Sequence, residues 1–298
     1  MSRDFNPQVY RLFSRAAVAL GSFLLALSAH AQIWAWDDGT TPFVVSPDQV
    51  VERMLYLGSP KPGELLIDLG SGDGRIVIEA AKRYGARGLG VDIEPQLVER
   101  ARANAKRAGV EERVEFRAQD LFETDLRGAS VVTMYLLPEV NQKLVPRLLA
   151  QLRPGARVVS HDYDMGKWPY DEMSEITLAE KMVGPLGRSR IYLWIVPGDA
   201  RGTWAADLPG HGGRWEFRIR QDFQLIDVDA RAGGTPLVVR GARLRGEEIH
   251  MAVTGLIAGK AWNQMFRGTI RDGNIEGDVR VSDGDRERIL PWKASRQP

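Results

Sequence analysis

Residues 65–74 read L-L-I-D-L-G-S-G-D-G, an apolar run followed by a turn that contains three glycines. The apolar run is typical of a buried strand, and the glycines allow the backbone to bend sharply and a ligand to lie against bare main chain. Apolar residues at helical spacing follow the turn, namely Ile76, Val77, Ala80, Ala81 and Tyr84. The stretch therefore predicts a strand, a ligand-binding turn and a helix, which form the first unit of an α/β fold.

The same alternation of strands and helices extends from Ser46 to Val196. Ser46 is the expected N-cap of the first helix, and Pro146 should bend or divide the last one, which opens at Pro138. Strands are expected at residues 64–69, 88–92, 114–118, 131–135 and 158–162, with 176–179 and 191–196 as a closing pair. This pattern predicts a mostly parallel sheet whose strand carboxyl ends share one ligand-binding edge.

The pattern changes after Pro197-Gly198, where helical spacing gives way to short alternating runs. Strands are expected at 215–219, 223–228, 237–239, 249–253, 264–266, 275–281 and 288–292. Glycine-containing turns separate them, including Gly233-Gly234, Asp272-Gly273 and Asp283-Gly284. The segment 198–298 is therefore predicted to form an antiparallel β-sandwich or a small barrel, distinct from the α/β domain at 46–197.

The N-terminal residues have the layout of a targeting segment. Three arginines precede an apolar run at 16–29, and Ala29-His30-Ala31 offers small residues before a cut at Gln32. The run is shorter than the roughly 20 residues that span a bilayer. Residues 1–31 are therefore predicted to be a signal peptide and 32–45 a linker, which makes the protein exported (periplasmic). The alternatives are an uncleaved membrane anchor, a mitochondrial presequence or a cytoplasmic protein.

Composition excludes several kinds of site. Lys and Arg number 40 and Asp and Glu 39, so the net charge of +1 gives no electrostatic case for a nucleic-acid partner. The chain has no cysteine, which excludes disulfide scaffolds, Cys-ligated zinc and Cys nucleophiles. Its four histidines are scattered, and no metal site is expected.

The glycine turn suits a cationic ligand better than a pyrophosphate. A dinucleotide fingerprint reads G-x-G-x-x-G, whereas here the third glycine, Gly74, comes one residue early. The turn also carries Asp68 and Asp73, whose carboxylates favour a positive charge. S-adenosylmethionine, which bears a sulfonium and an ammonium group, is a ligand of this kind.

Carboxylates also follow the next two expected strands. Asp92 lies 20 residues after Gly72, at a strand end where an acidic side chain can accept hydrogen bonds from ribose hydroxyls. Asp120 follows the third strand and can accept from the adenine amine, while Leu121 or Phe122 packs on the base. Each Asp alone has an ordinary alternative role as a cap or turn residue. Together they favour a nucleoside site.

The sequence D-L-G-S-G-D-G at 68–74, with V-D at 91–92 and Q-D at 119–120, resembles the class I S-adenosylmethionine-dependent methyltransferases. The resemblance covers residues 46–197 and implies a Rossmann-like sheet of seven strands, the last antiparallel. It implies that Gly70, Gly72 and Gly74 wrap the methionine part of the cofactor, that Asp92 holds the ribose and that Asp120 holds the adenine. Asp68 and Ser71, in the same turn, are also expected to bind the cofactor.

A narrower resemblance rests on V-V-T-M-Y-L-L-P-E-V-N-Q-K-L at 131–144 and V-V-S-H-D-Y-D-M-G-K-W at 158–168. These segments are similar to the ATP synthase c-subunit lysine N-methyltransferases and their bacterial relatives, in which a membrane-proximal segment precedes the catalytic domain. This resemblance implies N-methylation of a lysine side chain in a protein substrate. The alternatives are a small-molecule methyltransferase and a cofactor-binding or interaction protein with little turnover.

Three side chains are candidates for the transfer step. Tyr135 and Glu139 follow the fourth strand and could orient an amine, and Asp162 ends the fifth strand on the same edge, where it could act as general base or bind a cationic substrate. The alternatives are a packed aromatic for Tyr135, a first-turn helix residue for Glu139 and a polar loop for residues 160–164. The sequence has no N/D-P-P-Y/F tetrapeptide, which disfavours methylation of DNA adenine or glutamine.

Overall fold

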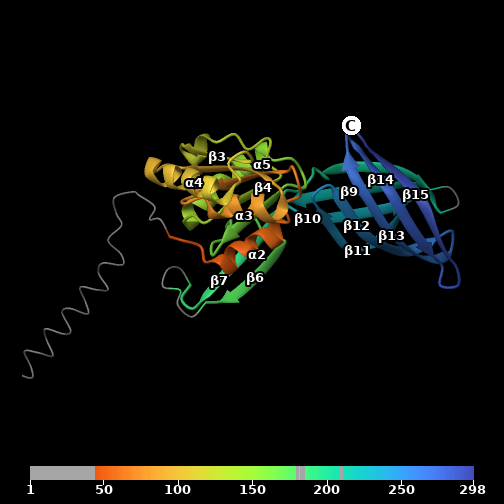
Figure 1. Ribbon diagram of the computed structural model, residues 1–298. Coiled ribbons are helices and arrows are strands. Elements are labelled where there is room, and N and C mark those ends of the chain that lie inside the picture. The colour runs from red at the N-terminus through yellow and green to blue at the C-terminus, as the bar shows by residue number, and fades with distance from the viewer. Residues whose placement is uncertain (1–43, 179–180, 182–184, 209–210) are drawn as a thin grey trace, which may run out of the picture. The chain divides into compact units, whose positions relative to one another are not determined.

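The computed structural model describes residues 44–178, 181, 185–208 and 211–298 (Figure 1). The chain separates into two units, Met1–Val44 and Val45–Pro298, and every element named below belongs to the second. The predicted signal peptide and most of the predicted linker lie outside the described residues. Among the residues that are described, no helix has both the length and the apolar character needed to cross a membrane.

The α/β part is built on a seven-stranded sheet with the order β3-β2-β1-β4-β5-β7-β6. Its strands are β1 Leu65–Leu69, β2 Arg87–Asp92, β3 Val114–Ala118, β4 Val131–Met134, β5 Arg157–His161, β6 Glu172–Thr177 and β7 Arg188–Ile195. Strands β1 to β5 are parallel, and β7 runs antiparallel to both β5 and β6. The predicted parallel sheet with an antiparallel last strand is confirmed.

Helices cover both faces of this sheet (Figure 1). They are α2 Asp48–Gly58, α3 Arg75–Tyr84, α4 Pro95–Ala108 and α5 Pro138–Gln151, with a 3-10 turn η1 at Leu121–Glu123. Side chains of α2, α3 and α4 share a core with Leu66, whereas α5 shares one with Ile67. Because successive strand residues face opposite sides of a sheet, the apolar run of β1 supplies both cores.

One local prediction for the helices is wrong, and the division that was one of two effects expected at Pro146 is not seen. The N-cap of α2 is Pro47 and not Ser46, whose hydroxyl instead makes a hydrogen bond of 3.0 Å to the His161 ring. The Ser46 side chain, which the local pattern assigned to the helix N-terminus, is therefore hydrogen-bonded to a residue that is distant in the sequence. Helix α5 runs through Pro146 without being divided.

Residues 202–296 form a closed, eight-stranded antiparallel barrel with the order β10-β11-β12-β13-β14-β15-β8-β9 (Figure 1). The strands are β8 Gly202–Leu208, β9 Gly213–Asp222, β10 Leu225–Ala232, β11 Thr235–Arg245, β12 Glu248–Ile257, β13 Lys260–Arg271, β14 Asn274–Ser282 and β15 Glu287–Arg296. The barrel alternative is thus confirmed, although β8 was not predicted.

Neighbouring strands of the barrel are joined by short turns, and the first and last strands close it. Gly233 and Gly234, and likewise Asp272 and Gly273, have positive φ angles, which matches the turns that twisted hairpins prefer. Phe223, expected inside a strand, is in such a turn with φ 52°. Closure comes from three register pairs between β15 and β8, from Ala294–Ala206 to Arg296–Trp204.

Candidate functional site

The glycine turn after β1 is held by main-chain hydrogen bonds to the end of β2. The amides of Gly70 and Ser71 both donate to the Val91 carbonyl at 2.9 Å. Gly70, Gly72 and Gly74 have φ angles of 77°, 53° and 80°, a region that side chains rarely occupy. A Cβ at Gly74 would lie 2.6 Å from the Phe116 ring. The turn therefore needs glycine both for its backbone angles and for close packing.

Asp92 at the end of β2 points back to this turn. Its Oδ2 accepts a hydrogen bond from the Gly72 amide at 2.8 Å, and its Oδ1 accepts one from the Glu94 amide at 3.1 Å. A carboxylate has about four lone-pair positions, so two remain for further donors. Asp92, the residue predicted to bind the ribose, is thus hydrogen-bonded directly to the glycine turn.

Asp68 lies under the turn and is almost completely buried. Its Oδ1 accepts a hydrogen bond of 2.6 Å from the Thr133 hydroxyl on β4. Burial raises the pKa of Asp68 to about 7, and the negative charges of Asp92 and Asp73 add to the rise. A carboxylate in these surroundings is stabilised by an added positive charge.

Asp73 does not share that property. Its carboxylate binds the guanidinium of Arg75 at 2.7 and 3.0 Å, and the pKa of Asp73 is lowered because this pairing outweighs burial. Asp73 was expected to favour a positively charged ligand, but Arg75, two residues along the chain, already supplies that positive charge. Asp68 and Asp92 are left as the carboxylates that can face a cationic ligand.

The residues predicted to hold adenine lie after β3, at the same strand ends. Asp120 is exposed, and its Oδ1 accepts from the Phe122 amide at 2.8 Å, which gives it the cap role that was its alternative. Leu121 is half-buried against the apolar cluster of β4 and α5. Ser71 is buried, and its hydroxyl has no hydrogen-bond partner in the part of the chain that the structure describes.

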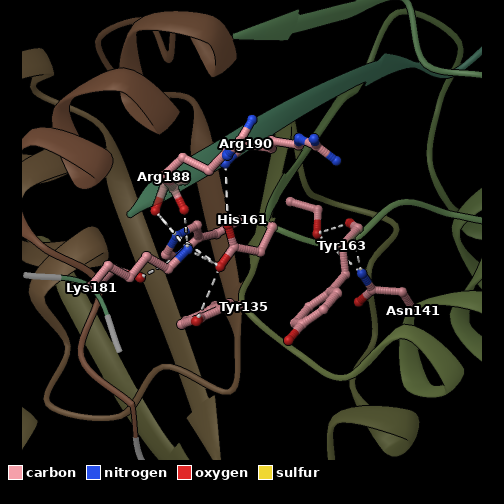
Figure 2. Close-up of polar contacts among 11 residues, drawn as sticks. Tyr135, Asn141, His161, Tyr163, Lys181, Arg188 and Arg190 are labelled. Carbon is pink, nitrogen blue, oxygen red and sulfur yellow. Dashed lines mark hydrogen bonds and ion pairs between the residues drawn. The ribbon is translucent and has the colours of Figure 1, made fainter. Parts of the chain in front are cut away.

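Tyr135 and Asp162, which directly follow β4 and β5, contact each other; Figure 2 shows Tyr135 in this region. The Tyr135 hydroxyl donates to Asp162 Oδ2 at 3.3 Å, and the Tyr135 ring lies 3.9 Å from the His161 ring, measured between centroids. Burial and the Asp162 charge raise the pKa of Tyr135 far above its ordinary value. The phenol therefore stays protonated at neutral pH.

Asp162 is a fully buried carboxylate with several partners. The Lys181 ammonium forms an ion pair with Oδ2, and the Arg190 amide donates to Oδ1 at 3.1 Å. Lys181 also donates to the Ser189 hydroxyl at 2.8 Å and the Arg188 carbonyl at 2.9 Å (Figure 2). The Asp162 side chain is thus enclosed by these partners, and it contacts the Tyr135 hydroxyl.

Glu139 lies apart from this pair. It is exposed in the first turn of α5, and none of its described contacts is with Tyr135 or Asp162. Its negative charge helps to raise the pKa of Tyr163, whose ring centroid lies 6.4 Å from that of Tyr135. Glu139 thus contributes charge near the site rather than a hydrogen bond within it.

Two polar side chains that the sequence analysis did not single out hold this region in place. Asn141 is buried on α5, and its amide donates to the Ser160 hydroxyl and the Tyr163 carbonyl, both at 3.1 Å. Lys181 comes 19 residues after Asp162, beyond β6. Neither residue has a local sequence signal, because each partner is fixed by the fold rather than by spacing.

His161 is an internal connector rather than a catalytic base. Its ring makes hydrogen bonds to Ser46 at 3.0 Å and Ser189 at 2.9 Å. Burial and the Lys181 charge lower its pKa to about 3, so the ring is neutral. Across the residues with described positions, no three His, Asp or Glu side chains gather in a way that could hold a metal ion.

Comparison with known proteins identifies the α/β part. Residues 68–172 match the family described as the ANTKMT methyltransferase domain. A protein-lysine N-methyltransferase of Saccharolobus islandicus (strain REY15A) is 40% identical over 136 residues, which are 45% of this chain and 84% of that protein. The adenine nucleotide translocase lysine N-methyltransferase of Mus musculus is 41% identical over 128 residues, 43% of this chain and 55% of the mouse protein.

A solved structure covers the same region. The RNA methyltransferase from Salinibacter ruber, crystallised with S-adenosyl-L-homocysteine, is 52% identical over 52% of this chain and 95% of its own, with a TM-score of 0.48. The cofactor of the family is S-adenosylmethionine, and the buried Asp68, the free lone pairs of Asp92 and the bare glycine turn fit a cationic nucleoside. The chain belongs to the class I S-adenosylmethionine-dependent methyltransferases that carry the ANTKMT methyltransferase domain.

Proposed function

We propose that this methyltransferase transfers a methyl group to a lysine side chain of a protein. The observation that carries the proposal is the Tyr135 hydroxyl, which the buried Asp162 fixes at the strand edge that also carries the glycine turn. The names of the Saccharolobus and mouse relatives support the same acceptor.

The chain would hold the cofactor through its first two strand ends. The glycine turn would lie against the methionine part, Asp92 would accept from the ribose hydroxyls, and Asp120 with Leu121 would bind the adenine. Asp68 would face the positive charge of the cofactor, which supplies an activated methyl group when bound. These residues bind and orient, and they leave the carbon–sulfur bond to the cofactor's own chemistry.

Tyr135 would orient the acceptor amine. Its proton is engaged with Asp162, so its oxygen lone pairs are free to accept from an N–H of the amine. A lysine has an ordinary pKa of about 10.4 and must lose a proton before it can act as nucleophile, which burial at the site favours. Asp162 is then a positioning residue, and Glu139 would attract the incoming cation.

The test is methyl transfer from radiolabelled S-adenosylmethionine by the full chain. Separate reactions receive membrane proteins, soluble proteins, total RNA and small-molecule extract, and labelled proteins are digested and analysed by mass spectrometry. We expect label in protein, as N-methyl-lysine. Label confined to RNA or to small molecules would contradict the lysine proposal and leave the methyltransferase assignment intact.

Replacement of Tyr135 separates catalysis from binding. Tyr135→Phe removes one oriented hydrogen bond, and we expect kcat to fall by roughly 10- to 100-fold with little change in cofactor affinity. Tyr163→Phe is the matched control, because that ring is a neighbour of Tyr135 and its hydroxyl has no hydrogen bond to Asp162 among the described residues. Equal losses in both variants would show that the Tyr135 hydroxyl has no special part in transfer.

A further inference from the structure

A polar side chain, Gln264, is buried within the apolar interior of the barrel. It lies on β13, is 1% exposed, and pairs in register with the buried Val253 on β12 and Val281 on β14. Neither its amide nitrogen nor its amide oxygen has a hydrogen-bond partner among the described residues. A buried amide without hydrogen-bond partners is destabilising, so Gln264 lowers the stability of the barrel.

Further polar groups lie at the same end of the barrel, which we call the Trp262 end. Trp262 precedes Gln264 by two residues and therefore faces the same side of β13. His211, between β8 and β9, is 7% exposed and meets the Trp262 ring edge-on at 4.7 Å. Its Nδ1 also has no partner among the residues with described positions.

Arg288 supplies a positive charge at this end. It lies opposite Val281 in the β14–β15 register, which places it on the inner side of the wall, and it remains exposed at the rim. Its charge contributes to the lowered pKa of His211. Arg288 forms no ion pair within the described part of the chain, whereas the nearby Lys260 is paired with Asp283.

Aromatic side chains form a packed cluster elsewhere in the barrel interior. Trp215, Phe217, Phe266 and Trp292 pack on one another with ring centroids 4.9 to 5.8 Å apart. Eight-stranded barrels are just wide enough either to be filled by side chains or to hold one small ligand. The Trp262 end, where the unpartnered polar atoms of Gln264 and His211 lie, offers a ligand hydrogen-bonding groups that the aromatic cluster does not.

We propose that the Trp262 end of the barrel binds a small aromatic carboxylate that carries a hydroxyl group. Arg288 would pair with the carboxylate, whose oxygens also suit the N–H donors of Gln264 and His211. The Gln264 amide oxygen would accept from the hydroxyl, and Trp262 would pack against the ring. This binding site is independent of the methyl acceptor proposed above.

Salicylate is the probe, titrated calorimetrically into the full chain. Benzylamine has a ring of the same size and the opposite charge and is the ligand control. We expect salicylate to bind, benzylamine to give no heat, and Gln264→Leu and Arg288→Gln each to weaken salicylate at least about tenfold, the loss of one charged or buried hydrogen-bonding partner. Arg218→Gln, on the outer face of β9, should bind salicylate like the wild type.

Stability gives a second readout that does not depend on the probe. Gln264→Leu removes an unpartnered buried amide, so we expect a higher unfolding temperature together with the loss of salicylate binding. The proposal is overturned if the wild type fails to bind salicylate at about 10 mM, a weak-binding limit, or if benzylamine binds equally well. Equal salicylate affinity in Arg288→Gln, a rim variant that leaves the core intact, would also overturn it.

Discussion

Two buried side chains, Asp68 and His161, have pKa values displaced in opposite directions, to about 7 and about 3. Between about pH 4 and 6.5 folded Asp68 keeps a proton that the unfolded chain has lost, so its contribution to stability falls as pH rises. Folded His161 lacks a proton that the unfolded chain binds, so its contribution rises. Between about pH 4 and 6.5 the two opposite changes in unfolding free energy with pH therefore cancel.

Single substitutions should reveal how Asp68 and His161 each make the unfolding free energy depend on pH. We expect the unfolding free energy of Asp68→Asn to rise by about 1.4 kcal/mol per pH unit relative to wild type, and that of His161→Gln to fall by a similar amount. Urea unfolding at pH 4.5, 5.5 and 6.5 measures both. If either variant followed the wild-type profile, the corresponding pKa shift would be refuted.

Asp92 offers a direct test of the cofactor site. Asp92→Ala removes the acceptor for ribose and frees the Gly72 amide, so we expect adenosylhomocysteine to bind roughly 30-fold more weakly, or about 2 kcal/mol for charge-assisted hydrogen bonds. Glu94→Ala removes a neighbouring charge and should leave the affinity unchanged. Calorimetric titration distinguishes the two, and an unaltered affinity in Asp92→Ala would remove the ribose assignment.

Sequence reasoning could place residues of the candidate site near one another where they follow strand ends. Gly70, Gly72 and Asp92 could be placed together because each follows a recognisable strand of a parallel sheet, and such ends share an edge. Lys181 could not be placed, since a buried ion pair with Asp162 is visible only once β6 and β7 return to the sheet. The same limit applies to Ser46, whose partner His161 lies 115 residues away.

At the scale of elements, two left-handed glycines at helix ends make a matched pair. Gly74 precedes α3 and Gly109 follows α4, with φ angles of 80° and 67°. A Cβ at Gly74 would meet Phe116 at 2.6 Å and Ala101 at 2.9 Å, whereas nothing lies within 4 Å at Gly109. Both positions carry backbone strain for alanine, but only Gly74 adds a steric clash.

Alanine substitution should separate strain from crowding. We expect Gly109→Ala to cost about 1 kcal/mol from its left-handed backbone alone, and Gly74→Ala to cost a further 1–3 kcal/mol because the core is overpacked. Gly74→Ala should also weaken adenosylhomocysteine binding, and Gly109→Ala should not. Thermal unfolding and calorimetry provide the measurements, and equal costs would contradict the packing argument.

The elements themselves were predicted with unequal success. The central strands β1, β4 and β5 are short, largely buried runs that contain consecutive apolar residues, so their type could be anticipated. Strand β8 was missed because its inward positions include Ala206, a small residue with little β signal, and the strand ends beside Pro209. Closure of the barrel rests on pairing between its first and last strands, which no local pattern reports.

At the scale of the whole molecule, we propose that the N-terminal segment directs export of the chain and is cleaved. We expect N-terminal sequencing of the protein from fractionated cells to begin at Gln32. A chain that retains residues 1–31 and sediments with membranes would instead identify an anchor, which keeps the catalytic domain in reach of cytosolic cofactor.

The pairing of β15 with β8 also constrains how the protein is made. All other neighbours in the barrel are consecutive hairpins, which can form as soon as each turn leaves the ribosome. The pairing of β15 with β8, which includes Ala294 and Ala206, cannot form until the nearly ninety residues between them have been translated. During that interval the nascent sheet has two open edges that other chains can join. Slow translation of β13 to β15 should therefore increase aggregation of newly made protein.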